Sequence, residues 1–228
     1  MSSTEGEDAD VIVVGAGPAG SATATYLARA GLSTLLLEKS SFPRPKACGD
    51  GLTPRAVKEL VTLGLPIKEQ DGWLRNKGVR VYGGGHTLEL PWPTLASFPD
   101  YGLTLPRETL DQRLAEHAQG AGAQLRQDTT VTGPVISDQN GFVTGVTAST
   151  KSGERTYRAR VVVAADGVSA RLATGIGRQA NAKRPVGIAV RTRIKLTQPP
   201  TRPGQTDWME SHLELWDGPR AHGKLMPG

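Results

Sequence analysis

The 228-residue chain has the composition of a globular protein, with 37% hydrophobic and 21% charged residues and a formal net charge of +5. These values exclude an intrinsically disordered chain, and the single cysteine excludes an internal disulfide. No apolar run approaches the roughly 18 residues of a spanning helix, and the acidic N-terminus lacks the features of a signal peptide. We therefore expect a cytoplasmic protein that makes at most peripheral contact with a membrane.

The positive charge gathers toward the C-terminus. Residues 1–170 hold 17 Lys and Arg against 18 Asp and Glu, whereas residues 171–228 hold 10 against 4. Such an end can meet phosphates or an anionic lipid surface, but a solvated face with scattered charges explains it equally well. Because no basic stripe alternates with aromatic residues, nucleic-acid binding is not expected.

A short strand and a glycine-rich turn come first along the chain. Residues 11–14, VIVV, form a β-branched run typical of a buried parallel strand. Gly15, Gly17 and Gly20 follow in the pattern G-x-G-x-x-G. The first permits a tight turn, the second lets the backbone approach a pyrophosphate, and the third lets the next helix pack closely on the strand. The pattern alone is weak evidence, since glycine-rich turns are common.

The elements after the turn make the pattern more specific. A helix is predicted over residues 21–30, and its N-terminus offers N–H groups and the positive end of its dipole to phosphates. A second strand over residues 34–37 ends in Glu38, whose carboxylate suits the hydroxyls of an unphosphorylated adenosine ribose. We therefore expect FAD or NAD at this site rather than NADP.

The only cysteine lies in the CGDGL loop (Cys48–Leu52), which leads into a predicted helix over residues 55–63. The backbone amides of this loop can face an anion or an electron-rich ring. Other interpretations are that Cys48 is a small buried residue and that Asp50 caps the following helix.

An antiparallel hairpin is predicted over residues 78–90, in which Val79 and Val81 face Leu88 and Leu90 across a glycine turn. Such a hairpin does not belong to a doubly wound sheet. It therefore predicts a second, substrate-facing layer inserted into the first domain.

An amphipathic helix is predicted to begin at Arg107, with Leu110, Leu114 and Ala118 on one face. A cation is unfavourable at a helix N-terminus, so Arg107 suggests an anion nearby; an exposed arginine is the alternative.

The rest of the chain is predicted to be mostly β-structure. Strands are expected over residues 124–128, 131–136, 142–149, 154–159 and 161–165. The last of these ends at Asp166 and Gly167 before a helix, which places small residues where ligands of α/β sheets bind. Two further strands, 186–195 and 209–216, are expected to pair with each other.

Several motifs give the chain a resemblance to a known family. The glycine-rich turn, "LPRETLDQRL" and "VVAADGVSARL" resemble the FAD-binding pattern of the p-hydroxybenzoate hydroxylase-like flavoproteins. Within that group, "FPRPKACGDGLTPRAV" closely resembles the geranylgeranyl reductase family of FAD-dependent oxidoreductases. The resemblance covers nearly the whole chain, and the CGDGL segment is its most specific part. The other motifs are shared with hydroxylases and halogenases.

The resemblance implies an α/β fold, with a Rossmann-like, three-layer FAD-binding domain and an inserted or appended antiparallel β-sheet for the substrate. We expect residues 11–75 and 103–178 to form the FAD-binding domain after a disordered acidic tail over residues 1–10. Residues 76–102 and 179–228 are expected to form an incomplete substrate-binding region. Family members continue through an aromatic segment and a third flavin motif, Gly-Asp, so the chain is expected to be the N-terminal portion of a reductase.

The resemblance also implies an activity. The family uses reduced FAD to saturate C=C bonds in polyprenyl chains, such as geranylgeranyl groups or quinone tails, and NADPH or another reductant supplies the electrons. The implied catalytic residues are Cys48, Gly49 and Asp50, with the Cys48 thiol shaping the pocket or assisting protonation beside the flavin ring.

The resemblance further implies which residues hold the cofactor. Arg107 would pair with the pyrophosphate or ribityl region, and Asp166 with the ribityl side. The full set of implied cofactor-binding residues is Gly15, Gly17, Pro18, Ala19, Gly20, Glu38, Lys39, Arg44, Cys48, Gly49, Arg107, Asp166 and Gly167.

Two alternatives stay open. One is an FAD-dependent monooxygenase of the aromatic-hydroxylase type, which the CGDGL loop disfavours; the other is a truncated FAD-binding fragment without turnover. No metal site is expected, because the four histidines are scattered without ligand spacing: His86, His117, His212 and His222.

Overall fold

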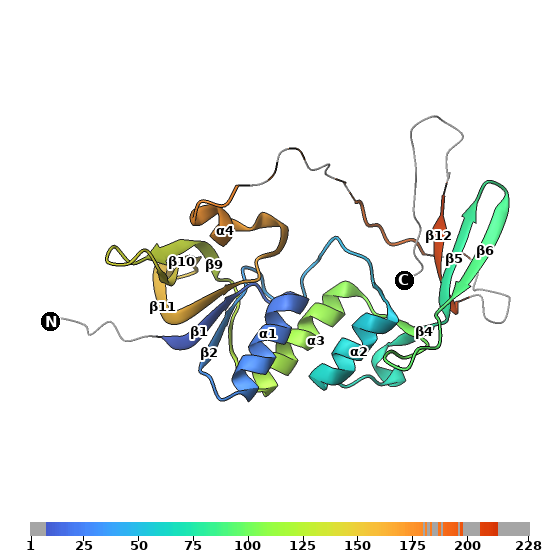
Figure 1. The fold of residues 1–228 in the computed structure, drawn as a ribbon, viewed down its shortest axis with the longest axis horizontal. Helices are drawn as coiled ribbons and strands as arrows, with labels where there is room; N and C mark the ends of the chain where they lie inside the picture. The colour runs from blue at the N-terminus through green and yellow to red at the C-terminus, as the bar shows by residue number, and fades with distance from the viewer. Residues whose placement is uncertain are drawn as a thin grey trace. The chain divides into compact units, whose positions relative to one another are not determined.

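The structure is a computed structural model, and it describes residues 8–179, 181, 183, 187, 189–195, 197 and 206–213 (Figure 1). The chain divides into two compact units. The first consists of Met1–Pro45 and Glu108–Gly187, and the second of Lys46–Arg107 and Ile188–Gly228.

A six-stranded sheet forms the centre of the first unit, in the order β8-β2-β1-β11-β10-β9. Its strands are β1 (Ala9–Val14), β2 (Thr34–Leu37), β8 (Gln124–Arg126), β9 (Thr130–Ile136), β10 (Val143–Thr150) and β11 (Gly153–Ala164). β8, β2, β1 and the end of β11 run parallel, whereas β11, β10 and β9 form an antiparallel meander.

One strand replaces the two that were predicted over residues 154–159 and 161–165. β11 continues without a break because it has a hydrogen-bonding partner along its whole length. Its first half pairs with β10 and its second half with β1. The helix predicted after Asp166 is reduced to a 3-10 turn, η2 (Gly167–Ser169), and a short helix, α4 (Arg171–Gly175).

Both faces of the parallel strands are covered. Helices α1 (Pro18–Arg29) and α3 (Arg107–Gly120) lie on one face, where alanines of both helices pack on Val11, Val13 and Leu36 (Figure 1). On the opposite face, Ile12 and Leu35 pack against residues of the meander. The first unit therefore has three layers, and the predicted Rossmann-like α/β fold is confirmed.

The second unit contains two three-stranded sheets and a helix. One sheet has the order β12-β5-β6, and the other has the order β3-β7-β4. The elements are β3 (Gly51–Leu52), α2 (Pro54–Leu63), the 3-10 turn η1 (Glu69–Asp71), β4 (Leu74–Asn76), β5 (Gly78–Gly83), β6 (His86–Pro91), β7 (Gly102–Thr104) and β12 (Trp208–His212). Helix α2 ends as predicted, at a left-handed Gly64.

The predicted hairpin is confirmed by β5 and β6, which place Val79 opposite Leu90 and Val81 opposite Leu88. The apolar side chains of both strands therefore point to the same face of this sheet.

The predicted pairing of residues 186–195 with 209–216 is wrong. β12 instead runs parallel to β5, whose second edge is open because β6 occupies only the other one. Residues 187 and 189–195 form no strand, while residues 186, 188 and 214–216 lie outside the described part of the chain.

Residues 46–75 and 103–107 belong to the second unit, although both segments were predicted to lie in the FAD-binding domain. The two segments stay together because β3 and β4 both pair with β7. The functional assignment of the two units stays a prediction. Within the described residues, no helix is long and apolar enough to cross a membrane.

Candidate functional site

The glycine-rich turn joins β1 to α1 in the first unit, and packing explains two of its three glycines. Gly15 has a φ of +100°, and a Cβ there would overlap the carbonyl oxygen of Ala165. A Cβ on Gly20 would overlap the carbonyl oxygen of Gly15. Both positions therefore require glycine for the turn to close and for the helix to approach the strand.

Gly17 is different from its two neighbours in the motif. Its φ of −77° and ψ of −176° are open to any residue. Among the described residues, a Cβ on Gly17 would meet only Nη2 of Arg44, at 3.9 Å. The protein's own packing therefore does not explain this glycine. The open space lies at the N-terminus of α1, where the backbone can approach a pyrophosphate.

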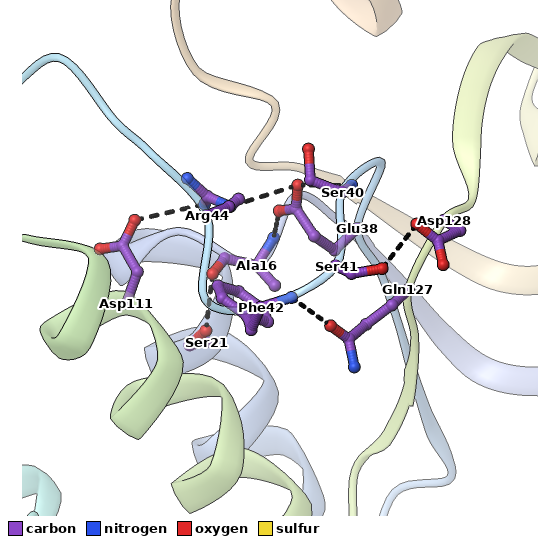
Figure 2. Close-up of polar contacts among 10 residues, drawn as sticks. All are labelled: Ala16, Ser21, Glu38, Ser40, Ser41, Phe42, Arg44, Asp111, Gln127 and Asp128. Carbon is purple, nitrogen blue, oxygen red and sulfur yellow. Dashed lines mark hydrogen bonds and ion pairs between the residues drawn. The ribbon is translucent and has the colours of Figure 1, made fainter.

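Glu38 follows β2 and places a buried carboxylate beside this turn (Figure 2). The residue is only 4% exposed. Its Oε2 accepts a hydrogen bond from the N–H of Ala16 at 3.0 Å, and its Oε1 accepts one from the N–H of Ser40 at 3.2 Å. The carboxylate thus fixes the turn, and each oxygen has a further lone pair that can accept a ribose hydroxyl.

Arg44 lies in the loop after β2, and its guanidinium lies between two buried carboxylates (Figure 2). Its Nε is 3.4 Å from Oε1 of Glu38, and its Nη2 is 3.2 Å from Oδ2 of Asp111. The guanidinium carbon also lies 5.2 Å from the centre of the Phe42 ring. A cation is therefore held next to Gly17, where the phosphate charge of a dinucleotide is expected.

The loop that carries Arg44 is anchored to the segment before β9 (Figure 2). The N–H of Phe42 donates to Oε1 of Gln127 at 2.6 Å, and the hydroxyl of Ser41 donates to Oδ1 of Asp128 at 2.7 Å. Hydrogen bonds from Lys151 and Ser41 lower the pKa of Asp128 below its usual value. Sequence reasoning gave no signal for these contacts, because the partners lie more than 80 residues apart.

The end of β11 reaches the same turn. The Cα of Asp166 lies 3.2 Å from the position that a Cβ would take on Gly15. Oδ2 of Asp166 accepts a hydrogen bond from the N–H of Leu172 at 3.2 Å, which orients the start of α4. The structure thus brings Asp166, and Gly167 after it, to the edge of the sheet that holds the glycine turn. A contact with the ribityl chain stays a prediction.

The remaining predicted residues of the first unit lie on its surface. Pro18 and Ala19 are exposed at the first turn of α1, and Lys39 is exposed directly after Glu38. A ligand at the turn can therefore reach them.

The CGDGL loop belongs to the second unit, and its first residues face solvent. Cys48 and Gly49 are both exposed. The interpretation of Cys48 as a small buried residue is therefore wrong, because its side chain is exposed. Contact of Cys48, Gly49 and Arg107 with FAD stays a prediction.

Asp50 does not cap the helix that follows it in the sequence. The N-cap of α2, Thr53, has no side-chain capping bond. Instead, Oδ1 of Asp50 accepts a hydrogen bond from the N–H of Arg107 at 2.7 Å. Its Oδ2 lies 2.7 Å from Nη2 of Arg191. The anion expected near Arg107 is therefore present as a carboxylate of the protein itself, at the start of α3.

We expect Asp50→Ala to destabilise the protein by about 1–3 kcal/mol. It removes the acceptor of the Arg107 N–H and one of the two acceptors of the Arg191 guanidinium, which also donates to the carbonyl oxygen of Lys46 at 3.3 Å. Chemical denaturation measures this loss. Asp50→Asn keeps an acceptor for Arg107 but not the charge. Its free energy of unfolding should lie between those of the parent and Asp50→Ala. Equal unfolding free energies for all three proteins would show that these contacts contribute nothing.

Asp111 is the site residue that sequence reasoning missed. It is fully buried on α3, with an exposed fraction of 0%. A signal was present, since Asp111, Ala115 and Ala118 follow the spacing i, i+4, i+7 and share a helix face. Both alanines are buried as well.

Comparisons with known proteins agree with this geometry. The sequence model of the family described as "FAD binding domain" matches residues 8–215. The chain is 40% identical over 220 residues to a menaquinone reductase of Mycolicibacterium smegmatis, covering 96% of this chain and 50% of that one. It is 35% identical over 171 residues to a digeranylgeranylglycerophospholipid reductase of Methanosarcina acetivorans, covering 74% and 40%. The chain thus spans about half the length of the curated relatives it matches.

Solved structures share the fold. A geranylgeranyl bacteriochlorophyll reductase-like protein from Thermoplasma acidophilum superposes with a TM-score of 0.70 at 26% identity, covering 91% of this chain and 50% of that one. The p-nitrophenol 4-monooxygenase PnpA from Pseudomonas putida has a TM-score of 0.62 at 26% identity, covering 74% and 43%. Reductases and monooxygenases therefore both occur among proteins of this fold.

Proposed function

The chain belongs to the FAD binding domain family, and from that premise we propose that it forms part of a reductase that saturates C=C bonds of a polyprenyl chain. The observation that carries the proposal is the match, over nearly the whole chain, to a protein named menaquinone reductase. The substrate is accordingly a geranylgeranyl group or the tail of an isoprenoid quinone, met in solution or at a membrane surface.

The residues of the first unit fit the adenosine and pyrophosphate part of FAD. The open space at Gly17 and the N-terminus of α1 receive the pyrophosphate. Arg44 faces its negative charge, and Glu38 accepts the hydroxyls of the adenosine ribose. These residues bind and orient the cofactor.

Reduced FAD, when bound, supplies the hydride for the alkene, and NADPH or another reductant supplies the electrons. In our proposal the CGDGL loop flanks the flavin ring, and Asp50 fixes its shape through Arg107 and Arg191. The exposed thiol of Cys48, or a water molecule, delivers the proton to the substrate carbon. An apolar polyprenyl chain covers the ring and excludes water.

The likeness to a monooxygenase makes oxygenation of the substrate the alternative function. Dependence on oxygen distinguishes a monooxygenase from a reductase. A reductase yields a product with two added hydrogen atoms and works without oxygen, whereas a monooxygenase adds an oxygen atom and stops under anaerobic conditions. We expect mass spectrometry to find the hydrogenated product. Running the assay both with this chain and with a chain extended to the length of its relatives tests whether the present residues turn over alone.

We expect Cys48→Ala to leave FAD affinity nearly unchanged but to slow alkene reduction about tenfold or more, since it removes a proton donor at the ring. Gly49→Val should be more severe. In our proposal the backbone of the loop approaches the flavin ring at Gly49, where a β-branched side chain would collide with the ring. Stopped-flow reduction kinetics in the extended chain, with Cys48→Ser as the conservative control, measure both effects. If both variants keep the parent rate, the loop is structural and its assignment to the flavin ring is wrong.

A further inference from the structure

Asp111 lies on the buried face of α3, where a carboxylate is unusual. A fully buried carboxylate loses its hydration, and a buried ion pair recovers that loss only with favourable geometry. Apolar residues of similar size often serve stability equally well at such positions. The neighbours of Asp111 on its helix face, Ala115 and Ala118, pack apolar side chains on the sheet. The carboxylate interrupts this apolar face at the point nearest to Arg44.

Asp111 forms an ion pair with the guanidinium of Arg44, with Oδ2 at 3.2 Å from Nη2 (Figure 2). The loop after β2 has no regular secondary structure, so side-chain contacts set the position of Arg44 within it. Glu38 holds the Nε end of the guanidinium, and Asp111 holds the Nη2 end. Nη2 is also the atom that lies nearest to the open space at Gly17. A planar guanidinium that lies between two carboxylates is oriented by both ion pairs, and this orientation sets the direction of its other N–H groups.

We propose that Asp111 is a positioning residue for the pyrophosphate of FAD, which acts by holding Arg44 over Gly17. The inference rests on the proposed FAD site but not on the substrate or the reaction. Without Asp111, Arg44 keeps its charge and its contact with Glu38, but Nη2 is free to turn away from Gly17. The diphosphate then loses a directed, charge-assisted hydrogen bond, whereas the adenosine contacts at Glu38 stay as they are.

The test measures ligand affinity rather than turnover, with FAD, ADP and adenosine as probes. Asp111→Asn should weaken FAD and ADP about tenfold and leave adenosine within about twofold, because only the phosphates face Arg44. Glu116→Gln makes the same change at an exposed position of the same helix and should alter none of the three affinities. Equal losses of affinity for ADP and adenosine would overturn the inference, because they would show that Asp111→Asn disturbs the whole binding site and not the phosphate contact alone.

A double-mutant cycle with Arg44→Gln tests the coupling. If Asp111 acts through Arg44, Asp111→Asn should change ADP affinity less than about twofold once Arg44 is replaced. A tenfold loss in both backgrounds would contradict the proposal.

Asp111→Glu, which keeps the charge but moves the carboxylate, supplies a second variant if Asp111→Asn does not fold. It should lose more affinity for ADP than for adenosine, each relative to the parent. A parent chain that binds neither FAD nor ADP would refute the FAD site itself, whereas an unaffected Asp111→Asn refutes only this inference.

Discussion

Gly17→Val is expected to abolish FAD binding while the protein stays folded. The backbone at Gly17 is extended. Among the described residues, a Cβ there would meet only Nη2 of Arg44, at the ordinary van der Waals distance of 3.9 Å, so we expect valine to fit the FAD-free protein. We expect a stability cost of about 1 kcal/mol, since valine is a poor helix N-cap. The same side chain would fill the space that the pyrophosphate needs. Fluorescence titration with FAD, together with thermal unfolding of the FAD-free protein, separates the two effects.

Gly20→Val is the matched control for this prediction. Here the added side chain collides with the backbone of Gly15, which cannot move away as a flexible side chain can. Gly20→Val should therefore lower the free energy of unfolding by about 1–3 kcal/mol or more. If Gly17→Val binds FAD like the parent, the pyrophosphate does not approach this turn and the cofactor site is misplaced.

Glu38→Ala should produce the second-largest loss, weakening FAD by roughly 1.5–3 kcal/mol, the range for hydrogen bonds to charged groups. The substitution removes the acceptor of the ribose hydroxyls. It also removes the acceptor of the N–H groups of Ala16 and Ser40, so the FAD-free protein should unfold more easily. Isothermal titration and chemical denaturation measure the two losses separately.

Asp10→Asn provides a comparison within the same sheet. Oδ2 of Asp10 also accepts a backbone hydrogen bond, from Ser33 at 2.8 Å, but at an exposed position. Its replacement should leave FAD affinity unchanged. An unchanged affinity in Glu38→Ala as well would show that Glu38 only stabilises the turn.

The local parts of the fold could be predicted from sequence because each has a local cause. The β-branched run of β1 and the glycine spacing determine the first strand, turn and helix without reference to the rest of the chain. The hairpin of β5 and β6 follows from alternating apolar residues around three consecutive glycines. Hydrogen-bond partners distant in sequence could not be predicted in this way. β12 pairs with β5 across about 130 residues, and β11 continues only because β10 and β1 pair with successive halves of it.

The same division holds for the candidate site. The glycines and Glu38 could be predicted because their motif is contiguous. The environment of Arg44 could not, since its partner Asp111 lies on another element and looks like one more polar residue of an amphipathic helix. For Asp50, a local interpretation was wrong. A cap on α2 was one expectation from the sequence, but the carboxylate accepts a hydrogen bond from Arg107, 57 positions away. Charged groups choose partners in space, and only the fold reveals those partners.

The proposed function is tested most directly by single-turnover oxidation of the photoreduced flavoprotein under anaerobic conditions. A chain extended to the length of its relatives is loaded with FAD, reduced, and mixed with menaquinone or another substrate that carries an unsaturated polyprenyl tail. We predict that the flavin absorbance returns at a rate that rises with substrate concentration, and that the tail gains one molecule of hydrogen per flavin oxidised. A flavin that stays reduced until oxygen is admitted, or a tail recovered with all its double bonds, would contradict the account.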